Sequence, residues 1–123
     1  MSNESSPDNQ TGGLVCRPWG SYRSLLVSDN HQIKEIFVSP GQRLSLQSHR
    51  YRSEHWVVVR GPALVTLDDR ERLLAEGEHV FIPKEARHRL ANPGREEIKV
   101  IEVQIGTYLG EDDIIRYQDD YHR

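Results

Sequence analysis

The chain has 123 residues, 36% of them hydrophobic, and its 16 basic and 19 acidic side chains give a net charge of -3. This length suits one hydrophobic core, so we expect a single domain. The acidic balance lacks the positive field that sequence-independent binding of nucleic acid requires, which argues against nucleic acid as a partner. No apolar run approaches the roughly 18 residues needed to cross a bilayer, so membrane contact is not expected.

The N-terminal residues and the cysteine content indicate the compartment. Cys16 is the one cysteine, which excludes an intrachain disulfide framework. The first residues lack the basic start and apolar run of a signal peptide, so we expect a cytoplasmic protein. Residues 1–13 are rich in Ser, Asn, Asp, Gln and Gly and predict a flexible tail, which leaves residues 14–123 for the folded domain.

Short apolar or alternating segments recur between turns after residue 14, a rhythm typical of an all-β barrel or sandwich. In chain order, the predicted strands are 33–38, 44–49, 55–59, 63–67, 79–82, 88–91 and 98–105. Turn residues separate them, among them Pro40-Gly41 and Asn92-Pro93-Gly94. The acidic-led segment 111–120 suits either a short helix or an irregular docked tail.

Two segments place metal-binding side chains next to strands. Residues 41–61 read GQRLSLQSHRYRSEHWVVVRG and fit G-x5-[H/Q]-x-H-x4-E-x6-G, with Gln47, His49 and Glu54 at the specified positions. Residues 77–92 read GEHVFIPKEARHRLAN and fit G-x5-P-x4-H-x3-N, which adds His88. A barrel that turns these strand faces inward gathers four ligands around one point. Two imidazoles and a carboxylate are a common ligand set for a divalent metal.

The two motifs resemble those of the cupin superfamily, whose fold is a double-stranded β-helix or jelly-roll barrel. Gln47 stands where most metal cupins have a histidine, and Glu85 replaces a cupin glycine. A Gln-His-Glu-His set resembles the metal site of phosphomannose isomerases. Further segments extend the likeness: RPWGSY, IPKEARHRLANPG and IEVQIGTYLGEDDIIR. About residues 17–123 look like the type II phosphomannose isomerase domain, usually the C-terminal part of bifunctional mannose-1-phosphate guanylyltransferase/mannose-6-phosphate isomerases.

This resemblance implies an enzyme, an aldose-ketose isomerase that interconverts mannose 6-phosphate and fructose 6-phosphate through an enediol. It also implies one divalent metal held by Gln47, His49, Glu54 and His88. Zinc is the first expectation by ligand type, although two histidines and a carboxylate also accept cobalt, manganese, nickel and iron. The length leaves no room for a nucleotidyltransferase domain, so nucleotide transfer is not expected.

Isomerisation moves a proton between C2 and C1, which requires a general base and stabilisation of an oxyanion. Glu102 shares a strand face with Gln104 and points either into the pocket or to solvent. Lys34, in an otherwise apolar strand, is the alternative proton-transfer group, and a solvated strand face is its simpler interpretation.

A phosphosugar also requires fixed positive charge, and arginine binds phosphate in a bidentate way. Arg43 shares the predicted ligand face and Arg116 lies in a family-like segment, so these two are the preferred phosphate contacts. Three others are more ordinarily surface charges: Arg17, Arg52 and Arg123.

Among the remaining aromatic and imidazole side chains, Trp56 shares the strand face of Glu54 and is the candidate for a sugar-stacking wall of the pocket. Trp19 is expected to anchor the N-terminal segment. The other histidines are expected to bind no metal: His31, His55, His79 and His122.

Two other functions stay open at this point. His49, Glu54 and His88 also form the ligand set of non-haem iron oxygenases. A cupin that binds a sugar phosphate without catalysis is the third class, since a detached domain can keep its fold and lose its activity. A homodimer is expected because apolar strand faces, Leu44/Leu46 and Val57/Val59, require cover.

Overall fold

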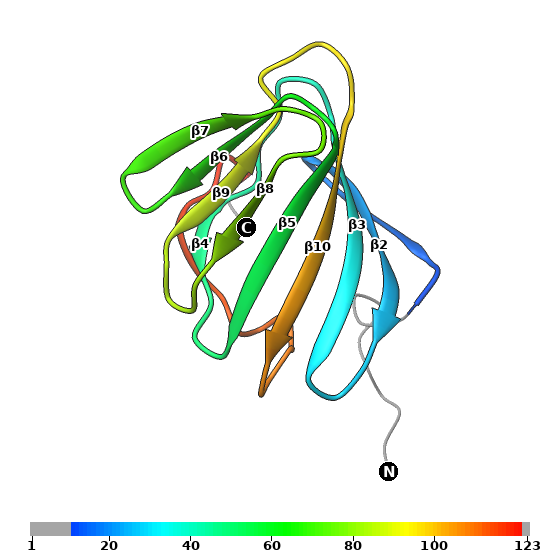
Figure 1. The fold of residues 1–123 in the computed structure, drawn as a ribbon, viewed down its shortest axis with the longest axis vertical. Coiled ribbons are helices and arrows are strands. Elements are labelled where there is room, and N and C mark those ends of the chain that lie inside the picture. Colours follow the sequence, from blue (N-terminus) through cyan, green and yellow to red (C-terminus); the bar gives the residue numbers. More distant parts are fainter. Residues whose placement is uncertain (1–10, 122–123) are drawn as a thin grey trace.

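A computed structural model describes residues 11–121, which form eleven β-strands and no helix (Figure 1). The strands are β1 (Leu14–Arg17), β2 (Gly20–Val27), β3 (His31–Val38), β4 (Leu46–Ser48), β5 (Arg52–Arg60), β6 (Ala63–Leu67), β7 (Arg70–Leu74), β8 (His79–Ile82), β9 (His88–Ala91), β10 (Ile98–Gly106) and β11 (Ile115–Gln118). The all-β prediction is therefore confirmed. Within these residues no helix is available to cross a membrane.

The strands build two antiparallel sheets. One has six strands in the order β1-β2-β3-β10-β5-β8, and the other has five in the order β11-β4-β9-β6-β7. Figure 1 places the strands of the smaller sheet mainly on the left and those of the larger sheet on the right. Sequence neighbours such as β4 and β5 lie in different sheets, so the chain alternates between the two layers, as in a jelly roll.

Strict alternation of burial along the central strands places one side-chain face between the sheets. Every second residue of β3 is buried, and β5 follows the same pattern from Arg52 to Val58. The apolar part of this face, including Val58, Val65, Leu90 and Val100, forms the core. Burial of such side chains contributes roughly 1.5 to 3 kcal/mol each.

Towards one end of the larger sheet the buried face becomes polar. In the register of β3, β10 and β5, Glu102 lies between Lys34 and Trp56, and Gln104 lies between Gln32 and Glu54. Buried polar side chains are stable only when they have partners, so this end of the barrel is organised as a hydrogen-bonded network.

All seven predicted strands exist, but four others were not predicted: β1, β2, β7 and β11. The strand β7 reads RERLL and is mostly exposed, so it has no apolar alternation to detect. The helix considered for 111–120 is wrong, because the chain pairs there as β11 with β4. Its acidic residues serve tertiary contacts instead of a helix N-terminus. The strand β5 also begins three residues earlier than predicted, at Arg52.

The predicted tail, residues 1–13, lies mainly outside the described residues, so its flexibility stays a prediction. Thr11 forms an isolated bridge with Ser24, and the Gly12 N–H donates to the Ser24 carbonyl at 2.8 Å. The described fold therefore reaches back to Thr11. At the other end, the predictions for His122 and Arg123 lie outside the described residues.

Candidate metal centre

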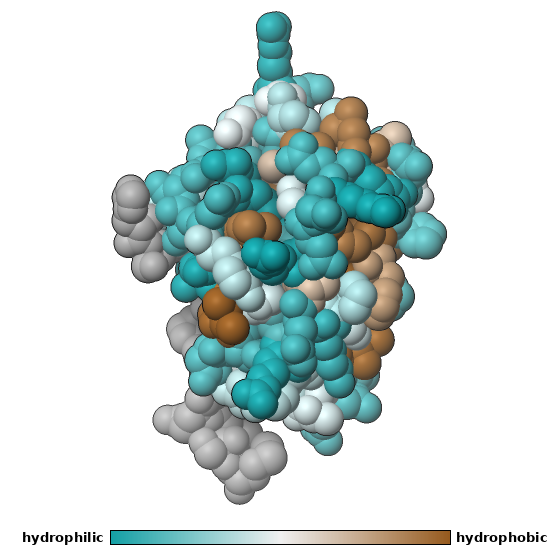
Figure 2. Space-filling model, turned by 90° about the vertical axis from the view of Figure 1, so that its left-hand side faces the viewer, coloured by the Kyte–Doolittle hydropathy of each residue, from teal (hydrophilic) through white to brown (hydrophobic). Residues whose placement is uncertain are grey.

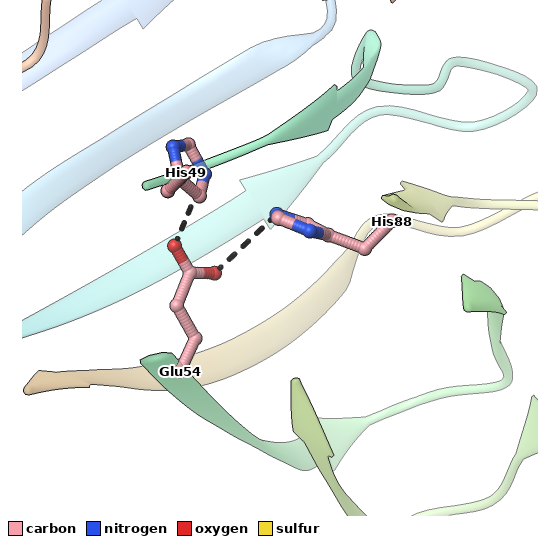
Figure 3. Close-up of side chains that lie close together, drawn as sticks. All are labelled: His49, Glu54 and His88. Atoms are coloured by element: carbon pink, nitrogen blue, oxygen red, sulfur yellow. Dashed lines mark ion pairs between the residues drawn. The ribbon is translucent and has the colours of Figure 1, made fainter. Parts of the chain in front are cut away.

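His49, Glu54 and His88 converge inside the barrel, as Figure 3 shows. His49 follows β4, Glu54 lies on β5 and His88 begins β9, so both sheets contribute. One ligand atom from each residue lies within 4.8 Å of the others. His49 Nε2 is 3.3 Å from one Glu54 oxygen, and His88 Nε2 is 3.8 Å from the other. This donor set fits a divalent metal ion.

Backbone carbonyls set the orientation of both imidazoles. His49 Nδ1 lies 2.6 Å from the Asp113 carbonyl, and His88 Nδ1 lies 3.0 Å from the Ala86 carbonyl. Because a carbonyl only accepts, each Nδ1 is the donor and each neutral ring keeps its lone pair on Nε2, which faces Glu54. Such outer hydrogen bonds are how proteins hold histidines ready for a metal.

Gln47, the fourth predicted ligand, lies on β4 directly opposite His88. Its side-chain Nε2 donates to Ser45 Oγ at 3.0 Å, so its carbonyl oxygen is the atom suited to a metal. Gln47 also lines the pocket beside the centre. Its role as a ligand stays a prediction.

Arg52 is a member of the site that the sequence did not single out. It is 6% exposed. Its Nε donates to Glu54 at 2.8 Å, and its Nη2 donates to His49 Nε2 at 3.1 Å. The expectation of a surface charge is therefore wrong. Strand parity was the available signal, because residues 52, 54 and 56 share one face once β5 is extended to residue 52.

Burial and neighbouring charges set the protonation of the centre. Burial favours the neutral form of Glu54, but Arg52 and the two histidines outweigh it and hold the pKa of Glu54 well below its usual range. Burial lowers the pKa of His49 to about 4. At neutral pH the centre thus presents a carboxylate and an uncharged His49 imidazole, which is the form that coordinates a metal.

Glu102 points inward, so of the two alternatives left open for it, the pocket orientation is correct. Trp56 Nε1 donates to Glu54 at 3.0 Å and to Glu102 at 3.1 Å, and Gln104 Nε2 donates to Glu102 at 2.6 Å. Burial, followed by the nearby Glu54 carboxylate, raises the pKa of Glu102 to about 8. Glu102 is therefore protonated at neutral pH in the metal-free protein.

Of the two tryptophans, Trp19 and not Trp56 lines the pocket. Trp56 is buried in the core, with its ring 5.5 Å from that of His88, and it orients two carboxylates rather than lining the pocket. Trp19 is buried against Tyr22 and does line the pocket. A prediction from strand parity gave the correct face of Trp56 but not the depth at which its ring lies.

A pocket opens beside the centre and is rich in charge. It is lined by Arg17, Trp19, Tyr22, Lys34, Ile36, Leu44, Gln47, Arg52, Glu102, Gln104, Glu111, Ile114 and Arg116. Lys34 is buried, and its Nζ lies 2.9 Å from Glu111, so the interpretation of Lys34 as a solvated strand residue is wrong. Arg116 lies on β11 opposite Gln47. Four cationic side chains thus face one pocket.

Arg43 lies elsewhere. Its exposed guanidinium pairs with Asp120 at 2.7 Å, and Arg43 is absent from the pocket lining. The predicted alternation from residue 43 to 49 fails because the regular strand covers only Leu46–Ser48. The position of Arg43 therefore gives no support to its predicted contact with phosphate.

Within the described residues, the cluster of possible metal ligands contains no other histidine. His31 contacts Asn30, and His55 packs beside Phe81 on the outer face of the sheet. The expectation that His31, His55 and His79 lie outside the metal centre is in accord with this arrangement.

Comparison with known proteins shows which family the sequence matches. A family model described as "Mannose-6-phosphate isomerase C-terminal" matches residues 4–119. The alginate biosynthesis protein AlgA of Pseudomonas aeruginosa is 55% identical over 109 residues, which are 89% of this chain and 23% of that protein. A mannose-1-phosphate guanylyltransferase of Escherichia coli is 50% identical, again over 89% of this chain and 23% of that protein. The chain spans about a quarter of the length of these curated relatives.

Solved structures support the fold independently. An RmlC-like cupin from Shewanella frigidimarina matches with a TM-score of 0.73 at 22% sequence identity, covering 90% of this chain and 96% of that one. Such low identity carries information on architecture only. The double-stranded β-helix of the cupins, expected from the two motifs, is confirmed.

Proposed function

The chain belongs to the family of mannose-6-phosphate isomerase C-terminal domains, and from this premise we propose that it is a metal-dependent isomerase of mannose 6-phosphate and fructose 6-phosphate. The observation that carries the proposal is the convergence of His49, Glu54 and His88 beside a pocket lined by cationic side chains. The first feature suits a Lewis acid and the second suits a phosphosugar.

His49, Glu54 and His88 would hold the metal, with Gln47 as the fourth ligand and zinc as the first expectation. A divalent cation there supplies electrophilic polarisation of the carbonyl and hydroxyl oxygens of the open-chain sugar. Gln47 is a neutral ligand, so it leaves more positive charge on the cation than another carboxylate would. The carbonyls of Asp113 and Ala86 keep both imidazoles in the coordinating tautomer.

Glu102 is the proposed proton-transfer group. Its carboxyl group lines the pocket and lies next to Glu54, held by Trp56 and Gln104. A buried carboxyl group whose pKa is about 8 exchanges a proton near neutral pH. Lys34, the alternative, is engaged by Glu111 at 2.9 Å, which favours a role in charge stabilisation over proton abstraction.

Arg116 is the proposed contact for the substrate phosphate. It lines the pocket from β11, whereas the carboxylates of the metal centre lie deeper in the barrel. Arg17 and Lys34 line the same pocket and add positive charge. An aldose phosphate would thus place its anionic end near these cations and its carbonyl end near the metal.

Assay of the purified protein with mannose 6-phosphate tests the proposal. Formation of fructose 6-phosphate in the presence of zinc, cobalt, manganese or nickel, and its loss in His88→Ala, is the expected result. Binding of the phosphosugar without turnover would replace the enzyme by a binding domain. Oxygen uptake with iron would favour an oxygenase, which uses the same set of two histidines and one carboxylate.

A further inference from the structure

Arg52 occupies donor atoms that a metal would require. Its Nη2 donates to His49 Nε2 at 3.1 Å, and its Nε donates to Glu54 Oε2 at 2.8 Å. A neutral imidazole has one lone pair, and that of His49 is on Nε2 because Nδ1 donates to the Asp113 carbonyl. This lone pair serves either the guanidinium or a metal, not both.

Charge leads to the same exclusion. Glu54 is buried, and its carboxylate requires a positive partner inside the barrel. Arg52 supplies that charge at 2.8 Å in this structure. A dication among His49, Glu54 and His88 would supply it too, and it would repel a guanidinium that cannot lose its proton.

A second acceptor for Arg52 lies close by. Among residues 11–121, its buried Nη1 has no hydrogen-bond partner, and it lies 3.9 Å from Glu111 Oε2. Glu111 belongs to the segment between β10 and β11, and it lines the same pocket as Arg52. A short movement of the guanidinium towards Glu111 would satisfy Nη1 and free His49 Nε2.

We propose that Arg52 is an internal cation that competes with the metal for His49 and Glu54, and that it moves to Glu111 when the metal binds. In the metal-free state Arg52 neutralises Glu54 and holds the ligands together. In the metal-bound state the guanidinium stands at the pocket, beside Lys34. This inference rests on the proposed metal dependence and deepens it, because it couples metal binding to the charge of the substrate pocket.

The test measures affinity for Co²⁺ by calorimetry and by the visible absorption of the bound ion. Arg52→Met keeps the apolar stem and removes the competitor, so its dissociation constant for Co²⁺ falls about tenfold or more. Glu111→Gln removes the acceptor for the displaced guanidinium, so its dissociation constant rises severalfold. In the double variant the effect of Glu111→Gln on the dissociation constant is largely lost, because Arg52→Met has already removed the guanidinium that Glu111 would accept.

Arg89→Met is the matched control. Arg89 and Arg52 are both 6% exposed, but Arg89 donates to the Leu44 carbonyl and to Gln118, away from the centre. Its loss therefore lowers stability without changing the affinity for Co²⁺. Thermal unfolding gives a second readout, since Co²⁺ stabilises Arg52→Met more than the wild type. Should Arg52→Met fail to fold, Arg52→Gln keeps a donor for Glu54 and still tightens binding.

The outcomes separate this inference from the proposed function. If Co²⁺ binds the wild type and Arg52→Met equally, or binds the variant more weakly, Arg52 merely supports the ligands, and the competition is refuted while the metal site stands. If neither protein binds Co²⁺, Zn²⁺, Mn²⁺ or Ni²⁺, the metal site itself fails and the competition fails with it.

Discussion

Folding raises the pKa of Glu102, whereas it lowers the pKa of Glu54. The pKa of Glu102 rises from 4.5 in the unfolded chain to about 8 in the metal-free fold, through burial first and the Glu54 carboxylate second. Between these values the folded state holds a proton that the unfolded state has lost. The contribution of Glu102 to stability is therefore fully present below about pH 4.5 and is lost as the pH rises through 8.

Glu102→Gln is predicted to remove this pH dependence, because the amide resembles the protonated acid and does not ionise. Between pH 4.5 and 8 the wild type should lose up to about 1.4 kcal/mol of unfolding free energy per pH unit relative to the variant. Urea unfolding of metal-free protein across this range measures the difference. Glu97→Gln, at an exposed position, should follow the wild type. Parallel curves for wild type and Glu102→Gln would refute the assignment.

Arg116 and Arg43 make a matched pair of exposed arginines, of which only Arg116 lines the pocket. Arg116→Ala is expected to raise KM for mannose 6-phosphate about tenfold or more, since a charged hydrogen bond contributes about 1.5 to 3 kcal/mol. Metal affinity should not change. Arg43→Ala loses a solvent-screened surface ion pair with Asp120 and should leave KM unaltered. Equal KM values for both variants would end the phosphate role of Arg116.

At the scale of elements, the segment that joins β10 to β11 anchors His49, one of the candidate metal ligands. The Asp113 carboxylate accepts the backbone N–H groups of Arg50 and Tyr51 at 2.9 and 3.0 Å, while its carbonyl accepts His49 Nδ1. Asp113 thereby holds both the loop after β4 and the buried ring of His49. The acidic run that suggested a helix has this tertiary use instead.

Asp113→Ala keeps the backbone carbonyl that accepts from His49 Nδ1 but removes the carboxylate that fixes this segment to the loop after β4. The ring of His49 is then held less firmly, so metal binding should weaken by up to about 10-fold. Calorimetric titration with Co²⁺ or Zn²⁺ measures it. Asp112→Ala is the control, since the Asp112 carboxylate accepts from the exposed Tyr108 hydroxyl and lies outside the centre. An unchanged affinity in Asp113→Ala would mean that the position of the His49 ring does not depend on the Asp113 carboxylate.

The turn before β9 carries a local strain at Glu85. Glu85 has φ of 68°, in the left-handed region, and its N–H donates to the His49 carbonyl at 2.8 Å. This conformation explains why the resemblance places a glycine there: a side chain in it costs roughly 1 to 2 kcal/mol. The backbone bond to His49 keeps the turn in place despite that cost.

Glu85→Gly should thus stabilise the fold by up to about 1 kcal/mol, because relief of strain exceeds the added entropy of the unfolded chain. Glu85→Val should destabilise it, since a β-branched side chain tolerates positive φ poorly. Chemical denaturation of the three proteins decides the order. A Glu85→Val variant as stable as Glu85→Gly would contradict this account of the turn.

On the scale of the whole molecule, the outer face of the larger sheet is the surface that most requires cover. Val57, Val59, Phe81 and Ile105 are 39 to 48% exposed, on the neighbouring strands β5, β8 and β10. Figure 2 shows apolar surface gathered along its right-hand side, which is the side that faces the viewer in Figure 1. The other face predicted for a dimer is Leu44/Leu46, but Leu44 packs against the core of the same chain.

We therefore predict a homodimer through the Val57/Val59 face, because exposed apolar patches of this kind mark interaction surfaces. Light scattering across micromolar concentrations should give twice the monomer mass, and Val59→Lys should reduce it to the monomer while leaving metal affinity intact. Leu73→Lys, at an exposed leucine on β7 in the other sheet, is the control. A monomeric mass for the wild type at all concentrations would refute the dimer.

The sequence by itself determined the all-β architecture and the candidate metal ligands. Alternation along 33–38, 55–59 and 98–105 has a period of two residues, which depends only on local geometry, and the spacing of His49, Glu54 and His88 fits known motifs. These features survive in the structure because each is encoded within one strand or one turn. Strands such as β7 and β11 lack that local signal, since their pairing and not their side-chain pattern defines them.

Only the tertiary structure decided which partners the inward side chains meet. Strand parity left both Glu102 and Lys34 with two possible faces, because the choice depends on the sheet packed opposite. The partners of Arg52 come from β5 and the loop after β4, and those of His49 include a carbonyl 64 residues away. Within one hydrogen-bonded network the pKa of Glu54 is lowered and that of Glu102 is raised. Both shifts depend on distances between residues of different segments, which no single segment contains.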